Sequence, residues 1–237
     1  MNCMRQPKLL QALIMLLVLS SSCHKSTDTA PVSVNIANAI INVDTVVSYL
    51  GYDPSMTFPK SPASIKFGAA AKYNSFSGNN SIMVVSSANK ATSFFSGTFN
   101  LDAGGIYSLF LCGTATAPDT LLINDQIPYY SDSSAGVRFV NLSPQSAAMK
   151  VNIAGAPTTS VVDPIAYKQA SAFKTFAATA NVTGSKYTFE IRNAANDSLL
   201  LTYTWSYSRY RNNTLLITGY ATPGSSPSLK IYSVNNY

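Results

Sequence analysis

The feature that most constrains the fold is a succession of short runs rich in Val, Ile, Phe, Tyr and Thr, each ended by Gly, Pro, Asn or Ser. Residues 81–87, 105–112 and 185–192 are examples. The spacing of apolar residues that marks an amphipathic helix is almost absent beyond residue 31. Many short β-prone runs separated by turn residues are typical of a sandwich or a barrel. The sequence therefore predicts an all-β protein.

The runs fall into two series that resemble each other. Val34–Asn38 (VNIAN) is echoed by Val137–Asn141 (VRFVN), and residues 105–113 are echoed by residues 213–219. Each series has about the number of strands of an immunoglobulin-like sandwich. We therefore expect two tandem immunoglobulin-like β-sandwiches, at residues 32–130 and 135–237. The polar stretch between them, YSDSSA, has the composition of a linker.

The N-terminal segment MNCMRQPKLLQALIMLLVLSSSC has the layout of a secretory signal. Arg5 and Lys8 precede an apolar core that is shorter than the roughly 20 residues that span a bilayer, and three serines follow that core. Leu19–Cys23 resembles the bacterial lipobox, with the Leu one position further from the Cys than in the usual pattern. We expect residues 1–22 to be removed, Cys23 to carry a lipid that anchors the chain to a membrane, and residues 23–31 to form a polar tether. The alternative is an ordinary signal peptide with a chance Cys.

Histidine and cysteine usage limits the chemistry of the exported part. The single histidine, His24, lies in the tether, where no rigid site can hold it. Beyond the signal and the lipidated Cys23, Cys112 is the only thiol, so no internal disulfide is expected. Cys112 lies in an apolar run, which favours a buried thiol over a nucleophile because no histidine is available to activate it.

Several motifs resemble the domain-of-unknown-function 4397 family. Residues 136–144 (GVRFVNLSP) followed by 149–153 are similar to its opening strand, Ser-Pro turn and second strand. Residues 167–173 and 186–192, and residues 107–113 running into 121–128, continue the resemblance. The resemblance is better in the second half, since no Ser-Pro turn follows Asn38, and the first half could be a degenerate copy or a different sandwich. It implies an exported, Bacteroidetes-type surface lipoprotein with immunoglobulin-like domains, and it supplies no catalytic residues.

Charge and motifs argue against several classes of function. The formal charge is +6, but the basic residues are scattered, whereas a nucleic-acid interface needs a basic stripe. No serine elbow, phosphate loop or zinc spacing is present, so no cofactor or metal is expected. Glu190 alternates with apolar neighbours and is expected on a wet strand face. The aspartates, among them Asp102, Asp119, Asp125 and Asp163, are interpreted as turn residues because they stand beside Gly, Pro or Asn.

The segment LLLTYTWSYSRYR, at residues 199–211, is the one candidate ligand surface. Strict alternation places Leu201, Tyr203, Trp205 and Tyr207 on one face of a strand. Exposed aromatic rings on a rigid sheet can stack on sugars, whereas the alternative is a core-facing stripe with a polar outer face. Near the following turn, Tyr210, Arg209 and Arg211 are expected to be exposed.

We therefore expect a non-enzymatic cell-envelope lipoprotein, attached to the outer membrane, that binds a glycan or an envelope protein. The alternative is a structural or accessory subunit of an envelope complex with no ligand of its own.

Overall fold

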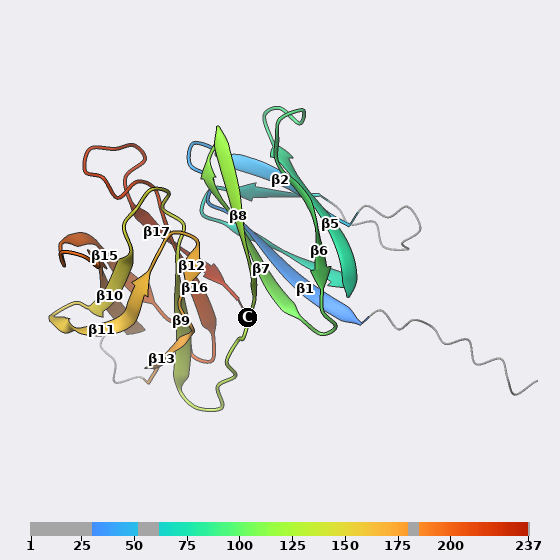
Figure 1. The fold of residues 1–237 in the computed structure, drawn as a ribbon. Coiled ribbons are helices and arrows are strands. Elements are labelled where there is room, and N and C mark those ends of the chain that lie inside the picture. The colour runs from blue at the N-terminus through green and yellow to red at the C-terminus, as the bar shows by residue number, and fades with distance from the viewer. Residues whose placement is uncertain (1–29, 52–61, 180–184, 237) are drawn as a thin grey trace, which may run out of the picture.

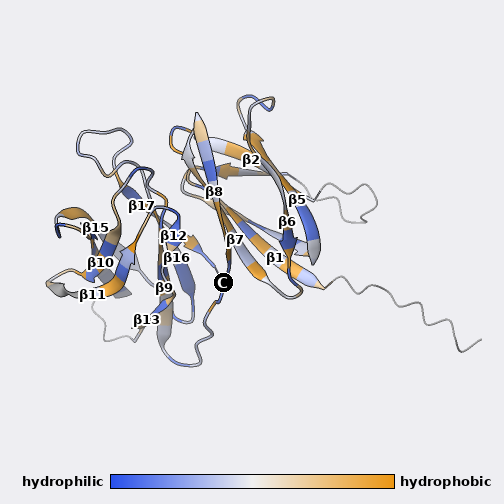
Figure 2. Cartoon of the chain, viewed as in Figure 1, coloured by the Kyte–Doolittle hydropathy of each residue, from blue (hydrophilic) through white to orange (hydrophobic). Residues whose placement is uncertain are grey.

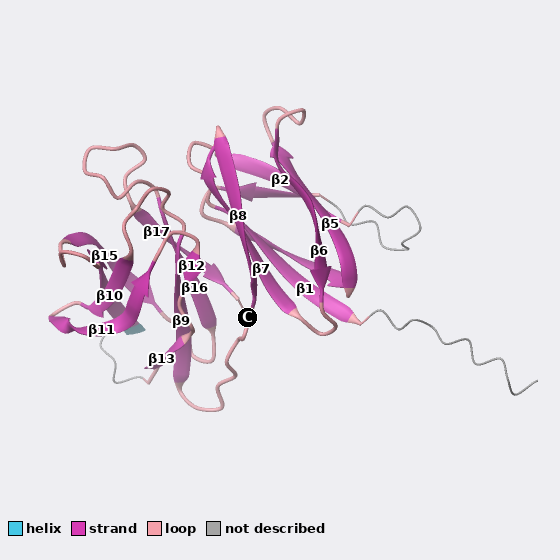
Figure 3. Cartoon of the chain, viewed as in Figure 1, coloured by secondary structure: helices cyan, strands magenta, loops and turns pink. Residues whose placement is uncertain are grey.

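The computed structural model describes residues 30–51, 62–179 and 185–236. Strands joined by turns and loops make up nearly all of this part, and every named element is a β-strand (Figure 3). The all-β prediction is therefore confirmed. The signal segment 1–22, the proposed lipid attachment residue Cys23 and His24 lie outside the described residues.

The N-terminal half forms two sheets that face each other, and all but one of their strand pairs are antiparallel. The N-inner sheet has the order β4-β1-β7-β8 and the N-outer sheet the order β3-β2-β5-β6. Buried side chains of both sheets, among them Val34, Val46 and Ile82, form one core. The strands are β1 (Pro31–Asn38), β2 (Thr45–Leu50), β3 (Ala63–Lys66), β4 (Ala70–Phe76), β5 (Gly78–Ser86), β6 (Ser93–Leu101), β7 (Ile106–Thr114) and β8 (Ala117–Asn124).

The C-terminal half repeats this arrangement. Its C-inner sheet has the order β12-β9-β16-β17, with β13 also paired to β9, and its C-outer sheet has the order β11-β10-β14-β15. Phe139, Phe189 and Trp205 are buried between these sheets. The strands are β9 (Ser134–Asn141), β10 (Met149–Ile153), β11 (Ala156–Ile165), β12 (Gln169–Ala170), β13 (Lys174–Ala177), β14 (Lys186–Asn193), β15 (Leu199–Ser206), β16 (Asn212–Thr218) and β17 (Lys230–Asn235).

The two echoed motifs occupy equivalent places in the halves. In each half the first strand pairs in parallel with a later one, β1 with β7 and β9 with β16. The asparagine that ends each first strand makes the same corner. Asn38 donates to the carbonyl of Ile65 and accepts from the N–H of Ile40, and Asn141 donates to the carbonyl of Ile165 and accepts from the N–H of Ser143. The pattern VNIAN/VRFVN therefore marks a structural repeat. That each half is an immunoglobulin-like domain bounded at 130 and 135 stays a prediction.

The inner sheets of the two halves pack against each other, so the four sheets form four layers (Figure 1). Side chains in β7 and β9 alternate between two buried surroundings. Leu109 and Phe139 point into the core of their own half, whereas Phe110 and Val140 meet between the halves with Leu216. Strands buried on both faces read as continuous apolar runs, and parallel pairs are typical of such positions. Strands nearer the surface carry hydrophilic residues between the hydrophobic ones (Figure 2).

A buried ion pair spans the interface between the halves. Arg138 on β9 donates from Nη1 to Asp125 Oδ1 at 2.7 Å, and the side chains are only 3% and 1% exposed. Its other nitrogens donate to Ser108 Oγ at 3.1 Å and Thr214 Oγ1 at 2.8 Å, so each half supplies acceptors. Asp125 was expected to be a turn residue, but it is buried as the counter-ion of an arginine. A buried charge is tolerated when it is paired and hydrogen-bonded, as here.

Candidate functional site

The aromatic stripe of β15 faces the core. Trp205 is 1% exposed, and its ring packs against Phe176, Tyr187 and Phe189 at centroid distances of 5.9–6.2 Å. Tyr207 is also buried, and its ring packs against Tyr187 at 5.6 Å and Trp205 at 5.9 Å. The indole N–H of Trp205 donates to Asn213 Oδ1 at 3.4 Å. The sugar-stacking interpretation is therefore wrong for Trp205 and Tyr207, because hydrophobic burial and ring packing remove their faces from water. Tyr203 is half-buried against the same core, and burial raises its pKa.

The turn after β15 presents the remaining three candidates to solvent, as expected. Tyr210 is 53% exposed, and Arg209 and Arg211 are exposed. The backbone N–H of Tyr210 donates to the carbonyl of Ser134 at 2.8 Å, and the carbonyl of Arg211 accepts from Gly136 at 2.9 Å. These bonds to β9 hold the turn in one position. Tyr210 adopts a left-handed φ of 61°, which directs the chain back into β16.

A polar cleft of about 470 Å³ lies beside this turn, where the two halves meet. Arg211 and Lys72 supply two cations from opposite halves, Arg211 from the C-terminal half and Lys72 from β4. No carboxylate is among its lining residues, which are Lys72, Ser206, Ser208, Arg211, Asn213 and Asn235. A cleft lined by hydroxyl groups, amide groups and two cationic side chains is suited to a small polar anion.

Hydrogen bonds fix two sides of this junction cleft. The ammonium of Lys72 donates to the carbonyl of Asn236 at 2.8 Å, which ties β4 to the end of β17. The amide of Asn213 donates to Asn235 Oδ1 at 2.6 Å while its oxygen accepts from Trp205. Trp205 therefore helps to position Asn213, which lines the cleft, but Trp205 is not itself a lining residue.

Sequence reasoning found Arg211 but missed Lys72. The segment Ala70–Phe76 contains too few apolar residues in alternation to stand out as a strand, and it becomes β4 by pairing with β1 over seven residue pairs. Only the packing of the halves brings Lys72 toward Arg211, so no local pattern could have signalled the pair.

Comparison with known families gives one decisive match. A family model described as "Domain of unknown function (DUF4397)" matches residues 23–154. The chain belongs to this family. The match covers the N-terminal half and the first two strands of the C-terminal half, whereas the sequence motifs had indicated the better resemblance further along. No curated protein matches this DUF4397 chain.

Solved structures resemble the DUF4397 chain only distantly. The Bacillus anthracis TIE protein aligns with 81% of the chain at 8% identity and a TM-score of 0.25, and the chain spans 34% of that protein. A family 26 carbohydrate-binding module of Eubacterium rectale Amy13K, solved with maltoheptaose, aligns with 86% of the chain and is itself 97% covered, at 12% identity and a TM-score of 0.25. A structure titled as a putative adhesin from Bacteroides ovatus aligns with 86% and is 92% covered, at 12% identity and a TM-score of 0.24.

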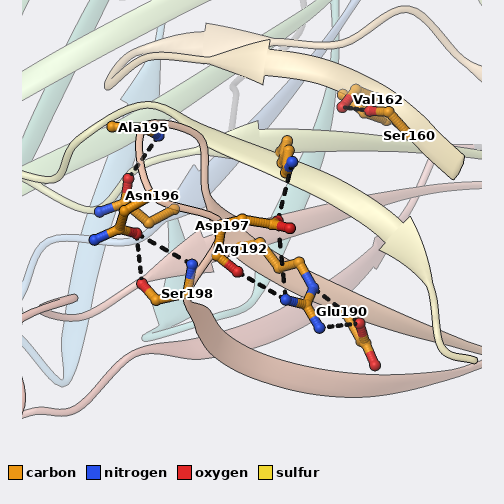
Figure 4. A network of polar contacts seen from close by, with 10 residues as sticks. Ser160, Val162, Glu190, Arg192, Ala195, Asn196, Asp197 and Ser198 are labelled. Carbon is orange, nitrogen blue, oxygen red and sulfur yellow. Dashed lines mark hydrogen bonds and ion pairs between the residues drawn. The ribbon is translucent and has the colours of Figure 1, made fainter. Parts of the chain in front are cut away.

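Glu190, the only glutamate of the DUF4397 chain, is held in an ion-pair network on the C-outer sheet (Figure 4). Arg192 donates to Glu190 Oε2 from Nη2 at 2.8 Å and to the carbonyl of Asp197 at 2.7 Å. Lys150 binds Asp197 Oδ1 at 2.9 Å, and this hydrogen bond lowers the pKa of Asp197. These groups neutralise one another, so the network stabilises the turn before β15 and offers no unpaired acid.

The buried thiol of the DUF4397 chain also lies between the halves. Cys112 is fully buried, as the sequence predicted, and the hydroxyl of Tyr167 donates to its sulfur at 3.5 Å. Burial raises the pKa of Cys112 to about 11. Among the described residues, no group of three or more His, Cys, Asp and Glu side chains could hold a metal. Within the same residues, no helix is long and apolar enough to span a bilayer.

Proposed function

We propose that the chain is a non-enzymatic, lipid-anchored protein of the cell envelope that binds a carboxylate-bearing glycan in the junction cleft. The observation that carries this proposal is that Lys72 and Arg211, from opposite halves, line one cleft whose other lining residues carry hydroxyls and amides.

The chemistry of the cleft matches an acidic sugar. A guanidinium binds a carboxylate through two parallel hydrogen bonds, and an ammonium adds a second, less directional charge. Ser206, Ser208 and Asn235 can exchange hydrogen bonds with ring hydroxyls. The exposed ring of Tyr210, one residue before Arg211, offers an apolar face to a sugar at the rim.

The test is a binding titration of the full chain, solubilised in non-ionic detergent, with polygalacturonate oligomers and with neutral dextran oligomers. We expect binding of the acidic oligomers only. Arg211→Gln and Lys72→Gln should each weaken binding about five-fold, since a solvent-exposed charge contributes up to about 1 kcal/mol. Lys90→Gln removes a charge that is also exposed, in the turn before β6, and should leave binding unchanged.

Equal binding of neutral and acidic oligomers, or equal losses for all three variants, would overturn the cleft proposal. No binding to any acidic glycan would favour the second candidate, a scaffold subunit of an envelope complex. The observation in favour of a scaffold is the buried Arg138–Asp125 pair, which links the two halves.

The envelope location rests on the N-terminal segment. The lipobox-like residues before Cys23 support a lipid anchor, and we propose the outer membrane as its site. Growth with radiolabelled palmitate should label the protein, and Cys23→Ala should abolish the label. A labelled Cys23→Ala variant would contradict the anchor.

The non-enzymatic part of the proposal is supported by the ion pairs of three acidic groups. Glu190 and Asp125 are each committed to an arginine, and Asp119 to Lys168 at 2.7 Å. General acid–base catalysis needs such groups free to take up or release a proton. Incubation with polygalacturonate should therefore release no reducing ends, and a rise in reducing ends would contradict this part.

A further inference from the structure

The outer edges of the four sheets differ in how they are protected. An edge strand presents unpaired N–H and C=O groups to any other strand, and proteins protect such edges by charge, by proline or by short length. Most edge strands here carry such a feature: Lys66 in the four-residue β3, Lys72 in β4, Asp119 in β8, Asp163 and Pro164 in β11, Lys174 in the four-residue β13, and Lys230 in β17.

The last strands of the two outer sheets, β6 and β15, carry none of these features. Neither SFFSGTFNL nor LLLTYTWS contains a charged residue or a proline. β6 runs against β8 of the facing sheet. In the part of the chain that the structure describes, β15 pairs with β14 alone. β15 is therefore the more accessible unprotected edge.

We propose that β15 is a self-association edge, which pairs antiparallel with β15 of a second copy of this chain. This goes beyond glycan binding and does not depend on it. An antiparallel pair of identical strands is related by a twofold axis and closes on itself, so it gives a dimer and no further polymer. The outer sheets of the two copies would form one continuous sheet.

The backbone N–H and C=O groups of every second residue of β15 point away from β14 and are available for this pairing. The N–H of Tyr207 donates to the carbonyl of Ser185 at 3.2 Å, opposite the end of β14. Hydrogen-bonded and non-bonded positions alternate along an antiparallel strand. The odd-numbered residues from 201 to 207 therefore direct their backbone groups to β14, and Thr202, Thr204 and Ser206 direct theirs outward.

The facing of the side chains and of the backbone groups of β15 is compatible with one symmetric register. Opposite residues of an antiparallel pair lie on the same face of the sheet, so the core-facing Tyr203 can stand opposite its own equivalent. This register places Thr202 opposite Thr204 of the second copy, and both of these residues direct their backbone groups outward. No like charges meet within the strand itself.

The test is the mass of the full chain in density-matched detergent, measured by analytical ultracentrifugation over a range of concentrations. We expect a reversible dimer. Thr204→Pro should remove it, because proline lacks the outward N–H but leaves the bonds between β15 and β14 in place. Thr204→Val keeps the N–H and the strand preference, and it should dimerise like the unaltered chain.

A double variant guards against misfolding. The double variant Thr202→Lys plus Thr204→Lys keeps every backbone group and sets lysines opposite each other across the twofold axis, so it should be monomeric with an unchanged circular dichroism spectrum. A monomeric unaltered chain, or a dimer that survives both Thr204→Pro and the double-lysine change, overturns the proposal. Binding of polygalacturonate by the monomeric variants separates this outcome from that of the junction cleft.

Discussion

Removing one charge from the buried pair between the halves should destabilise the whole chain. Asp125→Asn keeps the size of the side chain and leaves Arg138 charged, 3% exposed and without its counter-ion. Arg138 would retain Ser108 and Thr214 as acceptors and the ring of Phe173, 4.9 Å from its guanidinium carbon. These contacts reduce the loss of stability but do not neutralise the charge of Arg138.

The expected magnitude follows from the burial of both partners. Breaking a buried ion pair by removing one partner costs about 3–5 kcal/mol. For a chain of this size, each 1 kcal/mol lowers the melting temperature by about 2–4 °C, so Asp125→Asn should lower it by about 6–20 °C. Differential scanning calorimetry measures the shift, and urea unfolding gives the free energy.

A second ion pair between the halves supplies the control. Lys168 and Asp119 are also 2.7 Å apart, but their side chains are 34% and 40% exposed. Asp119→Asn should therefore cost no more than about 1 kcal/mol. Equal effects of the two changes, or a loss below about 1 kcal/mol for Asp125→Asn, would refute the reasoning that burial makes the Arg138 pair the main polar link between the halves.

Three further results are expected. Gly68→Ala should lower the free energy of unfolding in urea by about 1–3 kcal/mol, because Gly68 has a φ of +78° and an added Cβ would collide with the ring of Tyr232 from the other half. An unchanged urea midpoint would contradict this contact. Iodoacetamide at pH 8 should alkylate Cys112 far faster in urea than in the native chain, and fast alkylation of the native chain would contradict its burial. Because burial raises the pKa of the folded-state thiol, its contribution to the free energy of unfolding should be present below pH 9 and lost as the pH rises through about 11. The fluorescence of Trp205, the only tryptophan, should resist quenching by iodide and acrylamide, and strong quenching would mean that β15 is not packed against the core.

The strands of the core could be read from the sequence because their pattern is local. Runs such as 105–112 and 185–192 became β7 and β14 nearly as predicted. No comparable run in the sequence marks β4 or β11. Lys72, Asn74 and Ser75 interrupt the apolar pattern of β4, and β11 contains Pro164 and pairs with β10 through several register shifts. Both are edge strands, which depend on pairing with a neighbour more than on their own side chains.

The candidate site was only partly predictable because it depends on packing between distant segments. Alternation correctly placed Tyr203, Trp205 and Tyr207 on one face, but whether that face meets a core or water is decided by the facing sheet. Asp125 and Arg138 look like isolated surface charges in sequence, and they become a buried pair only when the inner sheets meet. Lys72 joins Arg211 for the same reason.

Hydrogen–deuterium exchange of the full chain with and without polygalacturonate oligomers tests the central claim, that the ligand site lies between the halves, most directly. The account predicts slower exchange in two separate segments, around Lys72 in β4 and from Ser206 to Asn213, with no comparable change in the remainder of the outer sheets. Protection confined to one half, or protection of the outer sheets alone, would contradict it.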